Sequence, residues 1–159
     1  MNSREAIRTI GSATLIVGGL DFVWATMNVF ISGGSVTKLW QFVASGVFGQ
    51  RAYSMGVSGA LSGVIFHFSI MAVFSLLIYV LYKRIPLIER HPIILGLVYG
   101  SCIWFAMNLL VVPLSNAGTG FVRMKLDMIL SAGFAINFVV HMILGLLLVL
   151  ITKRCLTAR

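Results

Sequence analysis

The sequence predicts an all-α membrane protein with four transmembrane helices, organised as a single integral membrane domain over residues 1–159. Two observations predict this fold class. Of the 159 residues, 59% are hydrophobic and only 10% are charged, whereas a water-soluble domain carries about 25% charged residues. The apolar residues also fall into runs of about 20 residues or more, the length that crosses a hydrocarbon core of about 30 Å. This composition excludes most classes of soluble enzyme.

Four apolar runs are expected to span the membrane, at about residues 9–33, 55–82, 92–112 and 128–152. The first run follows Arg4 and Arg8 and so has the charge pattern of a signal peptide. It is too long for one, Asp21 interrupts it, and no small-residue cleavage site follows. We therefore expect a retained membrane helix.

The connections between the runs differ in character. Segment Thr37–Tyr53 is too polar to span and too apolar to dissolve, which predicts an amphipathic outer-face helix in the interface or a short re-entrant element. Trp40 is expected at the level of the lipid headgroups. The next connection, Lys83–Pro92, is a short basic turn, and the last, Pro113–Asp127, is an outer loop.

The 12 Lys and Arg residues predict the orientation. Eight lie at run ends on one side of the membrane and four on the other. Because cytoplasmic segments carry the excess of Lys and Arg, both termini are expected in the cytoplasm, which in a bacterium means the inner membrane. The cations are dispersed over helix ends, so membrane lipids are expected partners and nucleic acid is not. The larger group is Arg4, Arg8, Lys83, Arg84, Arg90, Lys153, Arg154 and Arg159, and the smaller is Lys38, Arg51, Arg123 and Lys125.

A weak internal repeat relates the two halves of the chain. Trp24–Asn28 and Trp104–Asn108 both read W-x-x-M-N. His67 in the second run and His141 in the fourth each precede a Lys-Arg pair at the end of the run. These matches predict a parallel two-helix repeat about an axis along the membrane normal. Chance similarity between apolar helices is the alternative.

Several short motifs carry a family resemblance. They are Gln41–Gly49, His67-Phe68, Tyr99-Gly100, Met107-Asn108, Val111–Ser115 and the late His141. In these motifs the chain resembles a family of short bacterial four-helix membrane proteins of uncharacterised function, and it is distantly similar in layout to the YagU-like inner-membrane proteins. The resemblance implies four helices and a polar outer loop. It implies no catalytic residue, since no activity is established for the family.

Three ionisable residues are expected near the middle of the membrane. Asp21, His67 and His141 each lie 12 to 16 residues from the cation that marks the end of their run, which is about 18 to 24 Å along a helix. A charged group at that depth costs at least about 2.5 kcal/mol. Each of the three should therefore face the protein interior and find a partner.

Small residues at intervals of four share a helical face with the two histidines. The motifs are Gly59-xxx-Gly63-xxx-His67 in the second run and Gly133-xxx-Asn137-xxx-His141-xxx-Gly145 in the fourth. Gly96 and Gly100 give the third run a similar face, on which helix backbones can approach closely. We therefore expect a central polar seam and, nearer the outer face, a polar layer. The polar seam comprises Asp21, His67, Asn137 and His141, and the polar layer comprises Asn28 and Asn108.

Three interpretations of the polar seam are open. Its residues could be packing groups that hydrogen-bond across helices and fix the register or an oligomeric interface. They could instead serve transport or proton transfer, since histidine changes its charge between about pH 5 and 8, and four helices would then need a homo-oligomer to enclose a pathway. Third, His67 and His141 could ligate haem b, or form a metal site with Asp21. His91 is interpreted as a solvated loop residue.

The primary expectation is a binding, transport or assembly role of the polar seam. No catalytic motif of a hydrolase or phosphoryl-transfer enzyme is present, so we expect a protein that is not an enzyme. The glycine faces predict a homo-oligomer, and no cofactor is predicted. The alternative is an electron carrier with haem b held by His67 and His141.

Overall fold

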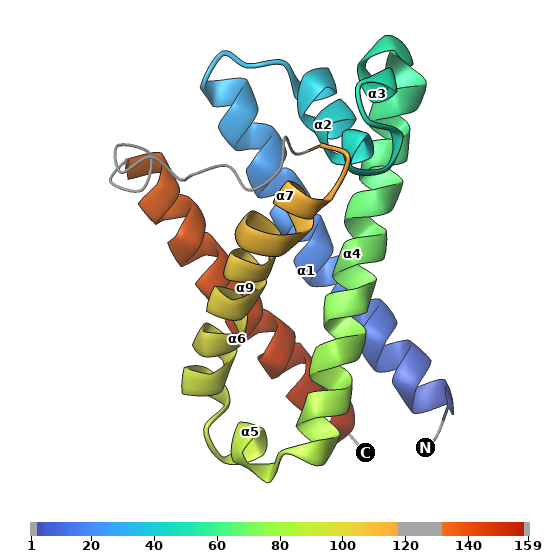
Figure 1. Cartoon of the computed structure of the whole chain (residues 1–159). Helices are drawn as coiled ribbons and strands as arrows, with labels where there is room; N and C mark the ends of the chain where they lie inside the picture. The colour runs from blue at the N-terminus through green and yellow to red at the C-terminus, as the bar shows by residue number, and fades with distance from the viewer. Residues whose placement is uncertain (1–2, 118–131, 158–159) are drawn as a thin grey trace.

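The computed structural model describes residues 3–117 and 132–157, and within these ranges the chain is helical without a strand (Figure 1). Four helical spans are long and apolar enough to cross a membrane. They are α1 (Ser3–Ile31), α4 (Val57–Arg84), the span Pro92–Leu114 and the span Gly133–Thr157 within α9 (Ala132–Thr157). The third span consists of α6 (Pro92–Ala106), the π-helix η1 (Met107–Val111) and α7 (Val112–Leu114). The chain is therefore a multi-pass, all-α membrane protein, as predicted.

The observed spans differ from the predicted runs by a few residues. α1 begins at Ser3 rather than near residue 9, because the polar side chains of its first two turns, Glu5 and Thr9, are buried against other helices. α4 and α9 continue to Arg84 and Thr157, past the predicted ends at residues 82 and 152. Residues 128–131 of the fourth predicted run lie outside the described residues.

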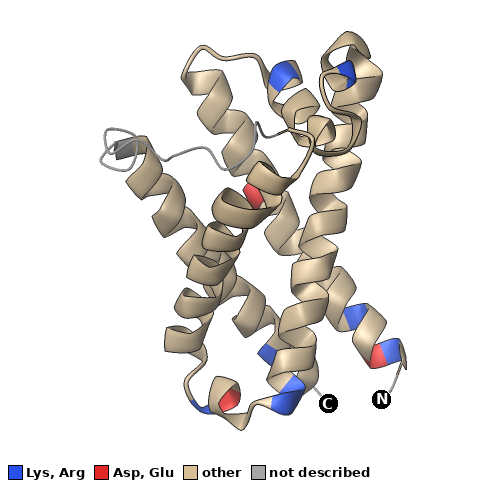
Figure 2. Cartoon of the chain, in the orientation of Figure 1, with Lys and Arg blue, Asp and Glu red and all other residues tan. Residues whose placement is uncertain are grey.

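Both termini lie at one end of the bundle, which we call the terminal end. There α5 (Pro86–Arg90) connects α4 to α6, so the predicted basic turn contains a short helix (Figure 1). α2 (Val36–Phe48) and α3 (Arg51–Ser54) lie at the opposite end (Figure 1). Lys and Arg occupy both ends, with more of them at the terminal end (Figure 2). The structure therefore places both termini on the side with the larger group of cations.

The segment between the first two spans is a helix that packs against α4 at the end opposite the termini (Figure 1). α2 begins after Ser35, whose hydroxyl accepts a hydrogen bond from the Lys38 amide at 3.3 Å, and it ends at Gly49, whose φ of 57° favours glycine. Trp40 is only 4% exposed and stacks on Phe22 of α1, with ring centroids 4.6 Å apart. α2 approaches α4 closely enough to bury the indole, and the expected depth of Trp40 at the headgroups stays a prediction.

Glycines form the closest contacts between helices. A Cβ atom at Gly63 of α4 would overlap the backbone carbonyl of Trp40 in α2. A Cβ atom at Gly100 of α6 would overlap the carbonyl of His141 in α9, where Gly145 packs on Gly100. The glycine faces expected to support self-association are thus used inside the chain. A homo-oligomer would need another surface.

The two halves of the predicted repeat pack differently. α6 meets α9 through glycine on glycine, whereas α1 meets α4 where Gly18 lies against the ring of Phe68. The Nε1 atom of Trp104 donates to Asn137, while the Nε1 atom of Trp24 has no partner among the described residues. The repeat stays a prediction.

Candidate functional site

A cavity of about 100 Å³ lies at the centre of the bundle, with lining residues from each of the four spans. Three of its lining side chains are ionisable, and they are Asp21, His67 and His141. The rest of the lining is apolar and includes Phe74 of α4 and Leu148 of α9. This volume has room for water. The cavity brings three of the four predicted seam residues together in an apolar surround.

His67 makes two contacts with α1. Its Nε2 atom lies 3.0 Å from the carbonyl oxygen of Gly18, and its Nδ1 atom lies 4.0 Å from the carboxylate of Asp21. Because a carbonyl oxygen only accepts, Nε2 carries the hydrogen, and in the neutral ring Nδ1 presents its lone pair to the carboxylate. Gly18 and Asp21 are three residues apart and so share one face of α1. The side chains of His67 and Asp21 are 12% and 17% exposed, so both are largely buried.

Aromatic rings enclose the imidazole of His67. Trp40 meets it edge to face, with centroids 5.4 Å apart and an interplanar angle of 70°. Phe68 lies at 5.1 Å and Phe22 at 6.4 Å. The imidazole of His67 is therefore packed among aromatic rings of α1, α2 and α4.

His141 is held by its own helix. Its Nδ1 atom lies 2.8 Å from the backbone carbonyl of Asn137, one turn earlier in α9. Nδ1 is therefore the donor, and Nε2 is the nitrogen that can accept a proton in the neutral ring. The contact of the His141 carbonyl with Gly100 fixes this turn of α9 against α6.

The three asparagines predicted as site residues do not line the central cavity. The side chain of Asn137 accepts a hydrogen bond from Trp104 Nε1 at 2.9 Å. Asn108 is exposed, and its amide donates at 2.9 Å to the Trp104 carbonyl of its own helix. Asn28 is exposed in the last turn of α1. Both asparagines of the polar layer expected nearer the outer face are thus exposed, and that layer stays a prediction.

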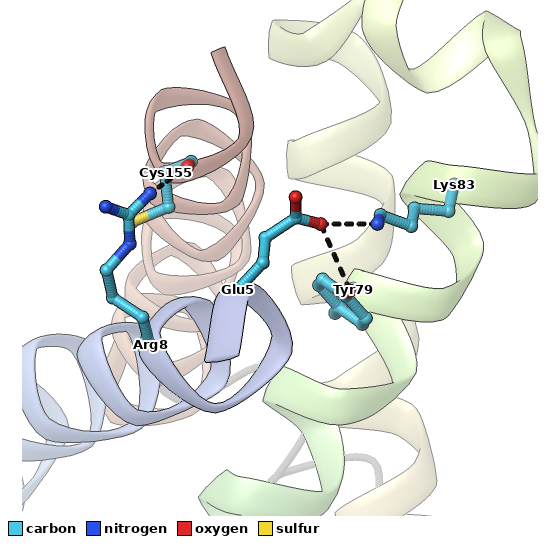
Figure 3. A network of polar contacts seen from close by, with 5 residues as sticks. All are labelled: Glu5, Arg8, Tyr79, Lys83 and Cys155. Atoms are coloured by element: carbon cyan, nitrogen blue, oxygen red, sulfur yellow. Dashed lines mark hydrogen bonds and ion pairs between the residues drawn. The ribbon is translucent and has the colours of Figure 1, made fainter. Parts of the chain in front are cut away.

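A second polar site, which the sequence analysis missed, lies at the terminal end (Figure 3). The carboxylate of Glu5 is only 7% exposed and accepts from Lys83 Nζ and, at 3.3 Å, from the Tyr79 hydroxyl. Arg8 donates to the Cys155 carbonyl at 2.8 Å, which joins α1 to α9 (Figure 3). The sequence did contain a signal for this site. Glu5 precedes the first run and Lys83 follows the second, so both were predicted at the same end of the bundle.

A more open cavity of about 330 Å³, which we call the terminal cavity, adjoins this polar site. It is lined by Glu5, Tyr82, Lys83, Pro86, Glu89, Leu156 and Thr157. Its lining is more polar than that of the central cavity, because carboxylates, an ammonium group and hydroxyls meet there. The structure thus contains a small apolar cavity with three ionisable groups and a larger polar cavity at the end that holds the termini.

The haem b and metal alternatives gain no support from this geometry. His67 and His141 would be the ligands, but the cavity between them is about 100 Å³, whereas ligand and cofactor sites usually measure about 300 to 1,000 Å³. Among the described residues, no group of three His, Cys, Asp or Glu side chains is arranged to hold a metal ion. Both alternatives stay predictions.

Comparison with known proteins gives no relative: no family model, no curated protein and no solved structure matches the chain. The resemblance to short bacterial four-helix membrane proteins therefore stays an expectation, and the geometry of the cavities is the basis for a functional proposal.

Proposed function

We propose that the protein binds and releases protons inside the membrane, at the central cavity formed by Asp21, His67 and His141, and that this site serves proton transfer or proton-coupled transport. The observation that carries the proposal is the 4.0 Å separation between His67 Nδ1 and the Asp21 carboxylate, in a cavity that His141 also lines. Ionisable residues inside membranes are costly and characteristic of proton and ion pathways.

Protonation of His67 requires little rearrangement. Nε2 keeps its hydrogen bond to the Gly18 carbonyl in both states, and the added proton resides on Nδ1, which faces Asp21. One bridging water or a small side-chain movement would complete the contact across 4.0 Å. The protonated pair is an ion pair without net charge, whereas the deprotonated pair leaves a carboxylate uncompensated in an apolar surround. The site therefore suits the binding of one proton.

His141 supplies the second group for proton exchange. The hydrogen bond of its Nδ1 atom to the Asn137 carbonyl leaves Nε2 to accept a proton from water in the cavity. A volume of about 100 Å³ suits water and protons better than an organic solute. This size is the reason for proposing a proton rather than a larger cargo.

The proposed location is the bacterial inner membrane, with both termini in the cytoplasm. Arg4, Arg8, Lys83 and Lys153 are among the described cations on α1, α4 and α9 near the terminal end, and only Lys38 and Arg51 of the described Lys and Arg residues lie at the opposite end. The positive-inside rule supports this orientation. The proposal includes a homo-oligomer, which would supply any part of the proton route that a single bundle lacks.

Proton flux into vesicles tests the proposed function. The purified protein is reconstituted into liposomes, a potassium diffusion potential set by valinomycin drives protons inward, and a trapped pH-sensitive dye reports the rate. We expect the wild-type protein to acidify the vesicles faster than protein-free controls. Asp21→Asn and His67→Gln should reduce the rate to that of the protein-free vesicles, because each removes one partner of the proton site.

His91→Gln is the matched control, because His91 is exposed at the start of α6 and lines neither cavity. It should conduct like the wild type. Size-exclusion chromatography and far-UV circular dichroism establish that each variant is folded. Wild-type flux equal to that of empty vesicles, or full flux in folded Asp21→Asn, would contradict the proposal.

A further inference from the structure

The central cavity and the terminal cavity are separated by about two helical turns. On α9, Leu148 lines the central cavity and Leu156 lines the terminal cavity. On α4, the corresponding residues are Phe74 and Tyr82. Both pairs are eight residues apart in sequence, which is about 12 Å along a helix. The layer between the cavities is therefore thin along α4 and α9.

Three buried hydroxyl groups occupy this layer. Thr152 of α9 lies four residues from the lining of each cavity, and Ser75 of α4 directly follows a residue of the central cavity. Thr9 of α1 lies one turn from Glu5, which lines the terminal cavity. All three residues are 0% exposed, and their hydroxyls have no hydrogen-bond partner among the described residues. We call Thr9, Ser75 and Thr152 the hydroxyl layer.

Some other helical hydroxyls bond to their own backbone, whereas those of Thr14 and Thr26 on α1 are also buried without a partner among the described residues. Ser69 of α4 donates to the Ile65 carbonyl at 2.8 Å, and Ser101 of α6 donates to the Leu97 carbonyl at 3.0 Å. A buried polar group without a partner is costly, and ordered water usually supplies the missing bonds. The unpaired hydroxyls of the hydroxyl layer therefore indicate bound water between the two cavities.

We propose that the hydroxyl layer holds water that joins the two cavities, so that the Asp21–His67 site exchanges protons with the terminal end of the bundle. The three side chains of the layer are 0% exposed, so this water would be enclosed by the bundle. The purpose of this route rests on the proposed function, but the presence of the water does not.

Two further features are consistent with proton exchange between the central cavity and the terminal end. Tyr82 lines the terminal cavity and is buried with an unpaired hydroxyl, which extends the series of buried donors to that cavity. On the side toward the opposite end, the indole of Trp40 packs on His67. The central site is therefore covered by an aromatic ring on one side and by hydroxyl groups on the other.

Water contact in the wild-type protein is the first test. The protein is prepared in detergent micelles with methyl-labelled Thr and Val, and magnetisation transfer from water to each methyl group is measured by NMR. Thr9→Ser and Thr152→Ser assign the two threonine signals. We expect transfer to both methyl groups and none to Val17 and Val149, which are equally buried on the same two helices. Absence of transfer to the threonines overturns the proposal.

Proton flux in the liposome assay is the second test. Ser75→Ala and Thr152→Val remove one hydroxyl each, and we expect each to reduce the flux by roughly tenfold, the effect of losing one hydrogen bond of about 1.4 kcal/mol along the route. Ser101→Ala is the matched control and should conduct like the wild type, because its hydroxyl is already bonded within α6.

The two tests separate this inference from the proposed function. Flux that depends on Asp21 and His67 but is unchanged in Ser75→Ala and Thr152→Val overturns the route and leaves the proton site intact. Wild-type flux equal to that of empty vesicles overturns the proposed function, and the NMR measurement then decides by itself whether water joins the cavities.

Discussion

Replacing Gly63 by alanine adds one methyl group at the closest approach of α2 to α4. The added Cβ would overlap the Trp40 carbonyl oxygen and lie 3.2 Å from the Ala44 amide nitrogen. Both obstacles are backbone atoms, so no change of rotamer can relieve them and α2 must shift as a unit. Since α2 carries Trp40 against His67, this substitution also shifts the ring that covers the proposed proton site.

The expected loss of stability combines two opposing effects. Overpacking of a well-packed contact costs about 1 to 3 kcal/mol. Alanine gains about 0.5 to 1 kcal/mol over glycine in the interior of a helix. Because the overlap at Gly63 involves backbone, the cost should be near the upper end of its range. We expect Gly63→Ala to lower the free energy of unfolding by about 2 kcal/mol.

Gly11→Ala is the matched control, because a Cβ atom at Gly11 of α1 has nothing within 4 Å. It should raise the free energy of unfolding by about 0.5 to 1 kcal/mol. Unfolding in mixed micelles, followed by circular dichroism as the fraction of denaturing detergent rises, gives both values. A Gly63→Ala protein as stable as Gly11→Ala would refute the close packing of α2 on α4.

Three further predictions test other parts of the structure. Trp40→Ala should lower the free energy of unfolding by about 3 to 5 kcal/mol in the same assay, as for a buried aromatic residue, whereas an indole at the headgroups would give a much smaller loss. Glu5→Gln should cost about 1 kcal/mol, because its lysine partner is partly exposed, while the exposed Glu89→Gln should change stability by less than about 0.5 kcal/mol. In a protein without its native cysteines, Ser32→Cys should react with a membrane-impermeant thiol reagent added to intact cells and Thr157→Cys only after permeabilisation; the reverse pattern would contradict the proposed orientation.

The sequence predicted the spans and the main partners of the central cavity. Length and apolar character suffice to predict the four spans, because a helix satisfies the hydrogen bonds of its own backbone within the segment, as the lipid environment requires. Asp21, His67 and His141 could be predicted to meet because depth in the membrane and small-residue spacing are both readable along one helix. The same reasoning placed Asn137 with them. It failed there because Trp104, on another helix, binds the amide.

The features that were missed depend on contacts between helices. Trp40 has the composition of an interfacial residue, and only the fit of α2 onto Gly63 buries it. Ser75 and Ser69 are alike in sequence, yet one is unpaired and the other bonds to its own helix. Such differences arise from side-chain rotation and packing, which no pattern within a single segment encodes.

Two polar contacts between α1 and α4 determine how well these helices would tolerate an insertion. Glu5 pairs with Lys83 and Asp21 faces His67, and the two contacts are 16 residues apart on each of the antiparallel helices, or about 24 Å. Both contacts therefore form in only one register of the two helices. One residue inserted between the two contacts would turn the remainder of that helix by about 100° and leave at most one contact in place. The same insertion in the loop after α1 would disturb neither contact.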